Sequence, residues 1–197
     1  MSFNKLSTSF YRRDSVVEVA RDLLGKVLCS HIDGHLTKAM ITETEAYAGA
    51  QDRASHAYAG RRTARTEPMY HEGGIAYVYL CYGIHHLCNV VTGKQDDPQA
   101  VLLRAGEPLA GLDEMCARRG KAAAGNKLLA GPGSLSQALG IRTELSGVSL
   151  LGNQVWIEDQ GFSAADDDIA IGPRIGVDYA GDDAARPYRF LLTRFPQ

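Results

Sequence analysis

Two carboxylates and an aromatic ring lie within one short stretch that reads as a β-strand, Ile-Thr-Glu-Thr-Glu-Ala-Tyr at residues 41–47. Side chains alternate between the two faces of a strand, so Glu43, Glu45 and Tyr47 are expected on one face. Ile41 would share it. Burial and mutual repulsion favour proton uptake by one of two such acids, which is the property of a general base. The alternative is a strand whose solvated face carries two glutamates, since most carboxylates are exposed.

A β-hairpin is expected to hold these acids in place. Residues 26–32 are rich in β-formers, and Asp33-Gly34 is a strong signal for a tight turn. The returning strand then runs from about His35 into the segment that contains Glu45. Because a side chain on a sheet is held more rigidly than one on a loop, the carboxylate would have a well-defined position.

The remaining elements predict a mixed fold. Ser15 and Glu18 form a capping box at the start of an amphipathic helix that ends at Gly25. Further helices are expected at 109–119 and 134–139. The inward face of the first helix would carry Leu109, Leu112, Met115 and Cys116. Strands are expected at 77–83, 100–105, 148–158 and 188–192, and a loop with a strand at 172–179. The sum is an α+β fold, a single domain over residues 1–197 with a curved, mainly antiparallel sheet flanked by short helices.

Composition restricts the classes of function. With 197 residues, 45% of them hydrophobic, the chain can bury a substantial core. A net charge of -2 gives no general basic footprint for nucleic acid, although a local patch can form on a neutral protein. Four cysteines without a Cys-x-x-Cys pair predict reduced thiols and no disulfides. No apolar stretch is long enough to span a membrane, so a cytoplasmic (nucleoid-associated) location is expected in a bacterium and a nuclear one in a eukaryote.

Residues 48–74 lack periodicity and are dominated by Gly, Arg, Thr, Ala and Pro. Unstructured connections of this length in a compact domain are usually functional or mobile. This one holds His56 in Ser-His-Ala-Tyr and an arginine cluster formed by Arg61, Arg62 and Arg65. It is therefore either a loop that lies over a ligand and meets phosphates, or a flexible excursion on the surface.

Three tyrosines follow, at Tyr77, Tyr79 and Tyr82. Tyr77 and Tyr79 share one face of the expected strand, where packing within the sheet is the simpler explanation for aromatic rings. Tyr82 falls at a turn beside Gly83, and a turn is poorly placed to bury a ring. Tyr82 is therefore a candidate for insertion into a binding partner.

A metal site is one competing interpretation. Cys81, His85, His86 and Cys88 are residue types that bind zinc and lie close together in the sequence. They lack the usual Cys-x-x-Cys or His-x-x-x-His spacing, which weakens the pattern. With Glu45 as the base, they would give a zinc-dependent hydrolase.

Several longer motifs occur in a fixed order along the chain. They are Glu-Thr-Glu-Ala-Tyr at 43–47, Ser-His-Ala at 55–57, Tyr-Val-Tyr-Leu-Cys-Tyr-Gly at 77–83, Asn-Val-Val at 89–91 and Val-Leu-Leu-Arg-Ala-Gly-Glu-Pro at 101–108. Gly-Pro-Gly at 131–133, Gln-Ala-Leu-Gly-Ile at 137–141 and Gly-Pro-Arg-Ile-Gly-Val-Asp-Tyr-Ala at 172–180 continue the series. In residues and spacing this series resembles the alkyladenine (3-methyladenine) DNA glycosylase family over nearly the whole chain.

The resemblance implies a hydrolase of base-excision repair that flips a damaged purine out of duplex DNA and cuts the bond between base and sugar. Glu45 matches the general base that activates a water, and Arg104 matches the arginine that helps to hold this water and the backbone of the flipped nucleotide. The implied partner is double-stranded DNA containing damaged purines, bound by a monomer. No metal, cofactor or membrane is implied. Since no motif lysine offers an amine nucleophile, the product would be an intact abasic strand.

The same resemblance assigns the substrate-binding residues. The aromatic walls between which the base stacks match Tyr47, His56 and Tyr79. Tyr82 matches the DNA-intercalating wedge that fills the gap left by the flipped nucleotide. Asn89 matches a residue that hinders guanine, and Leu102 would line the same pocket.

Two stretches depart from the family pattern. Residues 59–66 read Ala-Gly-Arg-Arg-Thr-Ala-Arg-Thr where the family tends toward Arg-Gly-x-Thr-x-Arg-Asn, and Ser134 stands where a lysine is frequent. Both bear on phosphate contacts, and so on DNA affinity and its salt dependence more than on the chemistry. A second competing interpretation is a non-catalytic module that binds damaged or single-stranded nucleic acid through Tyr47, Tyr79 and Tyr82.

Overall fold

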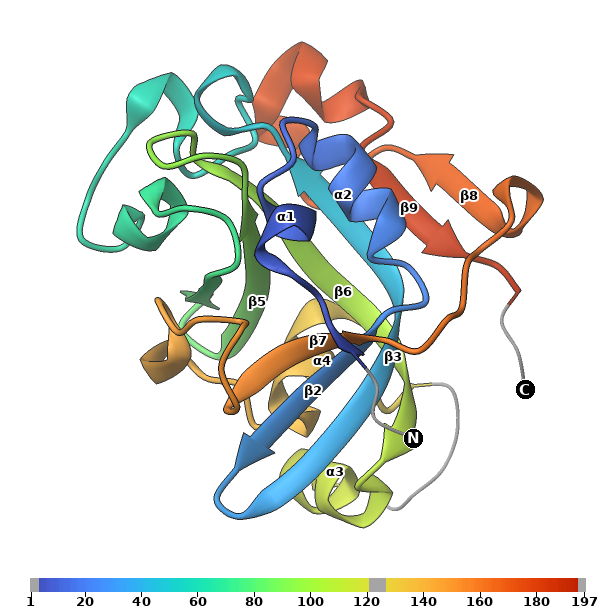
Figure 1. Cartoon of the computed structure of the whole chain (residues 1–197). Coiled ribbons are helices and arrows are strands. Elements are labelled where there is room, and N and C mark those ends of the chain that lie inside the picture. Colours follow the sequence, from blue (N-terminus) through green and yellow to red (C-terminus); the bar gives the residue numbers. More distant parts are fainter. Residues whose placement is uncertain (1–3, 121–126, 195–197) are drawn as a thin grey trace.

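The computed structural model describes residues 4–120 and 127–194, and nine strands of these residues form one sheet. The strands are β1 (Asn4–Lys5), β2 (Val27–Ile32), β3 (His35–Tyr47), β4 (Ala76–Cys81), β5 (His85–Thr92), β6 (Gln99–Ala110), β7 (Val155–Asp159), β8 (Ile169–Gly172) and β9 (Arg189–Leu192). Their order is β1-β7-β2-β3-β6-β5-β4, while β9 pairs with β3 and β8 pairs with β9. The sheet is antiparallel and curled into a half-barrel (Figure 1). The predicted α+β class is confirmed.

The helices are short and flank this sheet. They are α1 (Thr8–Tyr11), α2 (Val16–Asp22), α3 (Leu112–Arg119) and α4 (Pro132–Ala138), and single 3-10 turns occur at η1 (Gly49–Gln51), η2 (Tyr58–Gly60), η3 (Glu67–Tyr70), η4 (Thr143–Leu145), η5 (Asp166–Asp168) and, in a longer run, η6 (Asp178–Ala185). Helix α2 begins as predicted, because the Ser15 side chain accepts a hydrogen bond from the Glu18 amide at 3.2 Å. Its buried face packs against the sheet through Val16, Val19 and Ala20.

The predicted hairpin forms between β2 and β3. Asp33 and Gly34 both have positive φ angles, 54° and 81°, as the tightest hairpin turn requires. Strand β3 pairs with β6 along one edge, and its other edge is shared by β2 and then β9. Glu45 therefore has a strand on each side of it, with Leu102 of β6 and Arg189 of β9 as its partners.

The strict alternation expected for residues 41–47 is interrupted. The pairing of β3 with β6 shifts between Ile41 and Glu43 and again between Glu43 and Thr44. Ile41 lies in the main hydrophobic cluster, and the two carboxylates instead converge on Arg104 of β6. A β-bulge re-aims side chains in this way, which a period of two read from the sequence cannot anticipate.

The segment from Ala48 to Gly74 is anchored at both ends, while residues 58–65 in its middle are exposed. Three short 3-10 turns shape it, and Met69 and Tyr70 from its end join a buried cluster with Tyr77 of β4. Ala57, next to His56, belongs to the same cluster. The parts of the loop next to His56 and before β4 are therefore held against the sheet.

The helix expected at 109–119 begins later than predicted. Strand β6 continues to Ala110, which pairs with Lys38, and Leu109 is half exposed at 50%. Gly111 then takes a positive φ of 77°, a conformation that ends the strand and precedes α3. Of the four side chains expected inward, Met115 and Cys116 are buried, whereas Leu109 and Leu112 are exposed.

Two predicted strands are shorter or absent. Residues 148–154 form turns with one isolated bridge, between Ile75 and Ser149, and β7 begins only at Val155. The stretch 172–179, expected as a loop with a strand, contains only the last residue of β8 and then enters η6, where the Ala180 amide bonds to the Val177 carbonyl at 2.8 Å. Glycines that favour turns, Gly152 and Gly176, lie within these two stretches.

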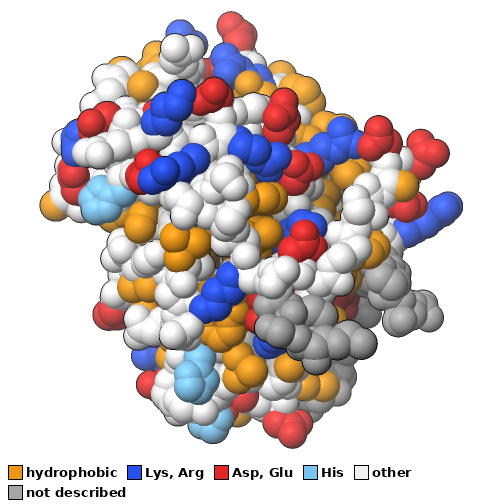
Figure 2. Space-filling view, viewed as in Figure 1, with side chains coloured by type: hydrophobic (Ala, Val, Ile, Leu, Met, Phe, Trp, Pro, Cys, Tyr) orange, Lys and Arg blue, Asp and Glu red, His pale blue; other side chains and the backbone are white. Residues whose placement is uncertain are grey.

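The four cysteines are free thiols, three of them buried. Within residues 4–120 and 127–194, no helix is long and apolar enough to cross a membrane. On the face seen in Figure 2, Lys and Arg side chains are interspersed with Asp and Glu, in keeping with the net charge of -2.

Candidate active site

The Glu45 carboxylate is fully buried and surrounded by donors. Its Oε2 accepts a hydrogen bond from the Tyr47 hydroxyl at 2.9 Å, and its Oε1 accepts one from the Ile175 amide at 2.8 Å. Arg104 Nη1 lies 3.3 Å from the same Oε1. A carboxylate has about four acceptor positions, so these three contacts leave one of them unfilled.

Arg104 reaches both acids because of a bulge. Glu43 pairs with Ala105 and Thr44 pairs with Leu103, which leaves Arg104 without a partner across the strands. Its side chain turns toward the acids, with Nε 3.2 Å from Glu43 Oε1. Arg189 of β9 approaches the same Glu43 oxygen at 3.3 Å, so Glu43 is shared by two guanidinium groups.

A cavity of about 590 Å³ opens in front of these groups. Its lining includes Tyr47, His56, Tyr79, Tyr82, Asn89, Leu102 and Arg104. All the substrate-binding and intercalating residues expected from the sequence thus lie around one cavity, although they come from β3, β4, β5, β6, the loop after β3 and the turn after β4. Glu45 lies behind this lining, joined to it through Tyr47 and Arg104.

One wall of the cavity is a cluster of aromatic rings. The His56 and Tyr79 rings meet edge to face with centroids 4.6 Å apart, and Tyr77 stacks on Tyr79 at 5.6 Å. The shared face expected for Tyr77 and Tyr79 is confirmed. Tyr77 also holds His56, because its hydroxyl lies 2.9 Å from His56 Nδ1. Burial, and then the charges of Arg65 and Arg61, lower the pKa of His56 to about 4, so the ring is neutral at neutral pH.

The side chain of Tyr82, the candidate wedge, is exposed to solvent. Tyr82 is 91% exposed, and it lies with Gly83 in the three-residue turn, 82–84, between β4 and β5. Both residues have positive φ angles, 51° and 73°, which is common for glycine but rare for tyrosine. The predicted position of Tyr82 at a hairpin tip is confirmed, and Ile84 beside it is also exposed, at 71%.

The candidate zinc ligands do not converge. Cys88 is buried in the main hydrophobic cluster, and His86 Nδ1 accepts a hydrogen bond from the Thr143 amide at 3.2 Å. Across the part of the chain that the structure describes, no three His, Cys, Asp or Glu side chains come together in a way that could hold a metal ion. The four side chains at 81–88 are thus close in the sequence but do not form a set of metal ligands in the described structure.

The arginine cluster divides into two groups. Arg62 is held by ion pairs to Glu67 at 2.6 Å and to Asp96 at 2.7 Å. Arg61 and Arg65 instead line a smaller cavity of about 290 Å³ beside His56, together with Arg53. The Arg65 guanidinium also lies over the Tyr79 ring, 5.1 Å from its centroid. Cationic groups thus gather at the rim of the aromatic cavity.

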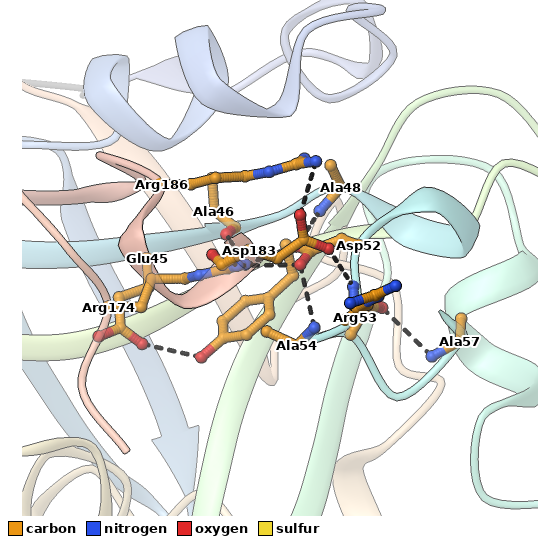
Figure 3. A network of polar contacts seen from close by, with 12 residues as sticks. Glu45, Ala46, Ala48, Asp52, Arg53, Ala54, Ala57, Arg174, Asp183 and Arg186 are labelled. Carbon is orange, nitrogen blue, oxygen red and sulfur yellow. Dashed lines mark hydrogen bonds and ion pairs between the residues drawn. The ribbon is translucent and has the colours of Figure 1, made fainter. Parts of the chain in front are cut away.

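A buried ion pair lies behind the site, and sequence analysis did not identify it. The Arg174 and Asp52 side chains are both fully buried, and the two arms of the guanidinium bind the two carboxylate oxygens, one of them at 2.9 Å. Burial alone raises the pKa of Asp52, but the Arg174 side chain and the Ala48 and Ala54 amides outweigh it and hold this pKa below its usual value. Figure 3 shows this network with Arg174 and Asp52 at its centre.

Comparison with known proteins identifies the class. A family model described as methylpurine-DNA glycosylase matches residues 9–196. A protein of Chlamydia abortus named "Putative 3-methyladenine DNA glycosylase" is 48% identical over 188 residues, covering 95% of this chain and 97% of that protein. Proteins of the same name are 43% identical in Desulfitobacterium hafniense, with 95% of each chain covered, and 45% identical in Methanocella arvoryzae, with 97% and 94% covered.

The chain belongs to the methylpurine-DNA glycosylase family. It is therefore an enzyme of DNA repair, a hydrolytic glycosylase whose substrate is DNA with damaged bases. The resemblance noted in the sequence is confirmed, while the roles of the single residues remain predictions.

Proposed function

We propose that this enzyme removes 3-methyladenine and related alkylated or deaminated purines from duplex DNA, and that it flips the damaged nucleotide into the 590 Å³ cavity and hydrolyses its glycosidic bond with a water activated by Glu45. The observation that carries the proposal is the buried Glu45 carboxylate, held by three donors behind a cavity with aromatic walls. The names of the relatives support the lesion class.

The proposed chemistry uses the free acceptor position of Glu45. A water bound there attacks the anomeric carbon while the bond to the base breaks, so positive charge develops on the sugar and the base leaves with the electron pair. Glu45 takes the proton of the water, and its carboxylate stabilises the developing charge. Arg104 holds Glu45 and Glu43 from the β6 side and can also bind the water or a nearby phosphate.

The cavity walls suit a flipped purine. Stacking on rings such as Tyr47, His56 and Tyr79 contributes about 1–3 kcal/mol per base, and a cationic methylated base adds attraction to the faces of the rings. Asn89 is fixed by bonds from its amide nitrogen to the Tyr77 carbonyl at 3.0 Å and the Leu87 carbonyl at 3.4 Å. A rigid side chain at this place suits the exclusion of guanine through its amino group.

The surroundings of the cavity suit duplex DNA. The exposed ring of Tyr82 can fill the space that a flipped nucleotide leaves in the stack. Arg53, Arg61 and Arg65 form a cationic hollow beside the base pocket that suits the phosphates on either side of the lesion. A single copy of the chain provides all of these groups, so it would act as a monomer.

The absence of lysine from the cavity lining supports hydrolysis by water. The described residues that line the cavity include two arginines, Arg65 and Arg104, but no lysine. An imine intermediate requires an amine, so the abasic strand would be released uncut.

The test is base release from duplex oligonucleotides that carry single lesions, with hypoxanthine and ethenoadenine as defined substrates and methylated DNA for 3-methyladenine and 7-methylguanine. The expected result is release of free base that resists a chelator, with strand cleavage only after alkali. Lesion-dependent binding without release from any substrate would refute the proposal and favour a non-catalytic binding module. Release that the chelator abolishes would favour the zinc-dependent hydrolase.

A further inference from the structure

The Arg174–Asp52 ion pair connects segments that are far apart in the sequence. The two residues are separated by 122 positions, and Arg174 also donates to the Ala46 carbonyl at 2.9 Å and to the Asp183 carbonyl at 3.0 Å. Asp52 accepts hydrogen bonds from the Ala48 and Ala54 amides, each at 3.0 Å. One buried pair thus joins the end of β3, the loop after it and η6 (Figure 3).

Each of these contacts lies next to a residue of the proposed site. Ala46 is between Glu45 and Tyr47, and the Asp52 turn leads within four residues to His56. Ile175, whose amide binds Glu45, directly follows Arg174. The Arg174 guanidinium also lies over the Tyr47 ring, 4.8 Å from its centroid, on a ring whose hydroxyl binds Glu45.

Stability alone is a weak reason for such a pair. Taking two charges out of water costs so much that an apolar pair of similar volume is often as stable or more so. What a buried bidentate pair does supply is one specific geometry, because the planar guanidinium must match both carboxylate oxygens and both carbonyls at once. A general base and the rings that hold its substrate need this kind of accuracy, since a displacement of about 1 Å can cost about 100-fold in rate.

We propose that Arg174 and Asp52 are positioning residues of this enzyme, which act on excision through Glu45, Tyr47 and His56 without touching the substrate. This inference rests on the proposed function. It requires that loss of the pair slow the chemical step more than it weakens binding, because the Tyr82 wedge and two of the three arginines of the cationic hollow, Arg61 and Arg65, lie outside the network.

The test measures the single-turnover excision rate and the Kd for lesion DNA for Asp52→Asn and Arg174→Lys. Asp52→Asn places an amide group against the guanidinium, and the single ammonium of Arg174→Lys cannot span the carboxylate and both carbonyls. For each variant we expect excision to be slower by about 10- to 100-fold, with Kd within about threefold of the wild type.

Lys38→Met is the matched control. It breaks a different ion pair, which is only partly buried: Lys38 Nζ on β3 lies 2.9 Å from Glu158 Oε2. Neither of these two side chains lines the cavity. It is expected to lower the melting temperature but to leave the excision rate within about twofold. Circular dichroism identifies the folded variants, and Arg174→Lys decides the question if Asp52→Asn does not fold.

Three outcomes would overturn the proposal. They are a wild-type excision rate in a folded variant, a loss of excision matched by an equal loss of binding, and failure of both variants to fold, which would make the pair purely structural. If the wild-type enzyme itself releases no base, the proposed function fails first. An active wild type with active variants refutes only the positioning role.

Discussion

Replacing Glu45 with glutamine gives the sharpest test of the proposed chemistry, because the structure accommodates the change. The glutamine oxygen can accept from the Ile175 amide, which now lies 2.8 Å from Glu45 Oε1. The glutamine nitrogen then faces the Tyr47 hydroxyl, which can turn from donor to acceptor. Arg104 keeps its contact with Glu43 at 3.2 Å. The variant should therefore fold and keep the shape of the cavity.

The expected magnitude follows from the loss of proton transfer. A neutral amide cannot take a proton from water, and a positioned general base contributes about 10²- to 10⁴-fold in rate, or about 3–5 kcal/mol of the barrier. Glu45 lies behind the cavity lining, so substrate contacts remain largely unchanged. We expect excision to fall by this factor while the Kd for lesion DNA stays within about threefold.

The assay is single-turnover release of hypoxanthine from a duplex with enzyme in excess, accompanied by a binding titration and a thermal melt. Glu43→Gln is the matched control, since Glu43 contacts Arg104 and Arg189 but does not line the cavity. Its rate should fall by about tenfold at most. Excision by Glu45→Gln within about tenfold of the wild type, or equal losses in the two variants, would refute the assignment of the base.

Three further predictions use other parts of the site. Tyr47→Phe keeps the ring but removes the donor 2.9 Å from Glu45 Oε2, so single-turnover excision should slow by about 10- to 100-fold, from a bond worth about 1.5–3 kcal/mol; an unchanged rate would contradict the contact. Tyr82→Ser removes a ring that is 91% exposed, so the melting temperature should hold while the fluorescence of a flipped reporter base falls. An unchanged reporter signal would count against the wedge. Because folding lowers the pKa of His56 from 6.5 to about 4, this ring contributes stability above pH 6.5 that is lost as the pH falls toward 4. The melting temperature of His56→Gln should therefore fall less over that range than the wild-type value, and parallel curves would contradict the shift.

Local patterns predicted the parts of the fold whose partners are close in the sequence. The capping residues of α2 and the Asp33-Gly34 turn act over a few residues, and both occur as expected. The tip position of Tyr82 follows from the same kind of signal. The errors arose where pairing between distant strands decides the outcome. Residues 109–110 extend a strand because Ala110 pairs with Lys38. Residues 148–154 and much of 172–179 were expected to form strands but find no strand partner beyond the bridge at Ser149.

By itself the sequence determined which side chains are available for chemistry and, through its motifs, the family to which the enzyme belongs. Only the tertiary structure decided how the acids are held. Arg104 reaches Glu43 from 61 residues away, and the Ile175 amide reaches Glu45 from 130 residues away. Arg174 and Asp52 resemble ordinary loop charges in the sequence, because nothing near either of them shows that its partner is 122 residues distant and that both will be buried. These residues form a site because they are buried and held in one geometry, and both properties arise from contacts that form only when the chain folds.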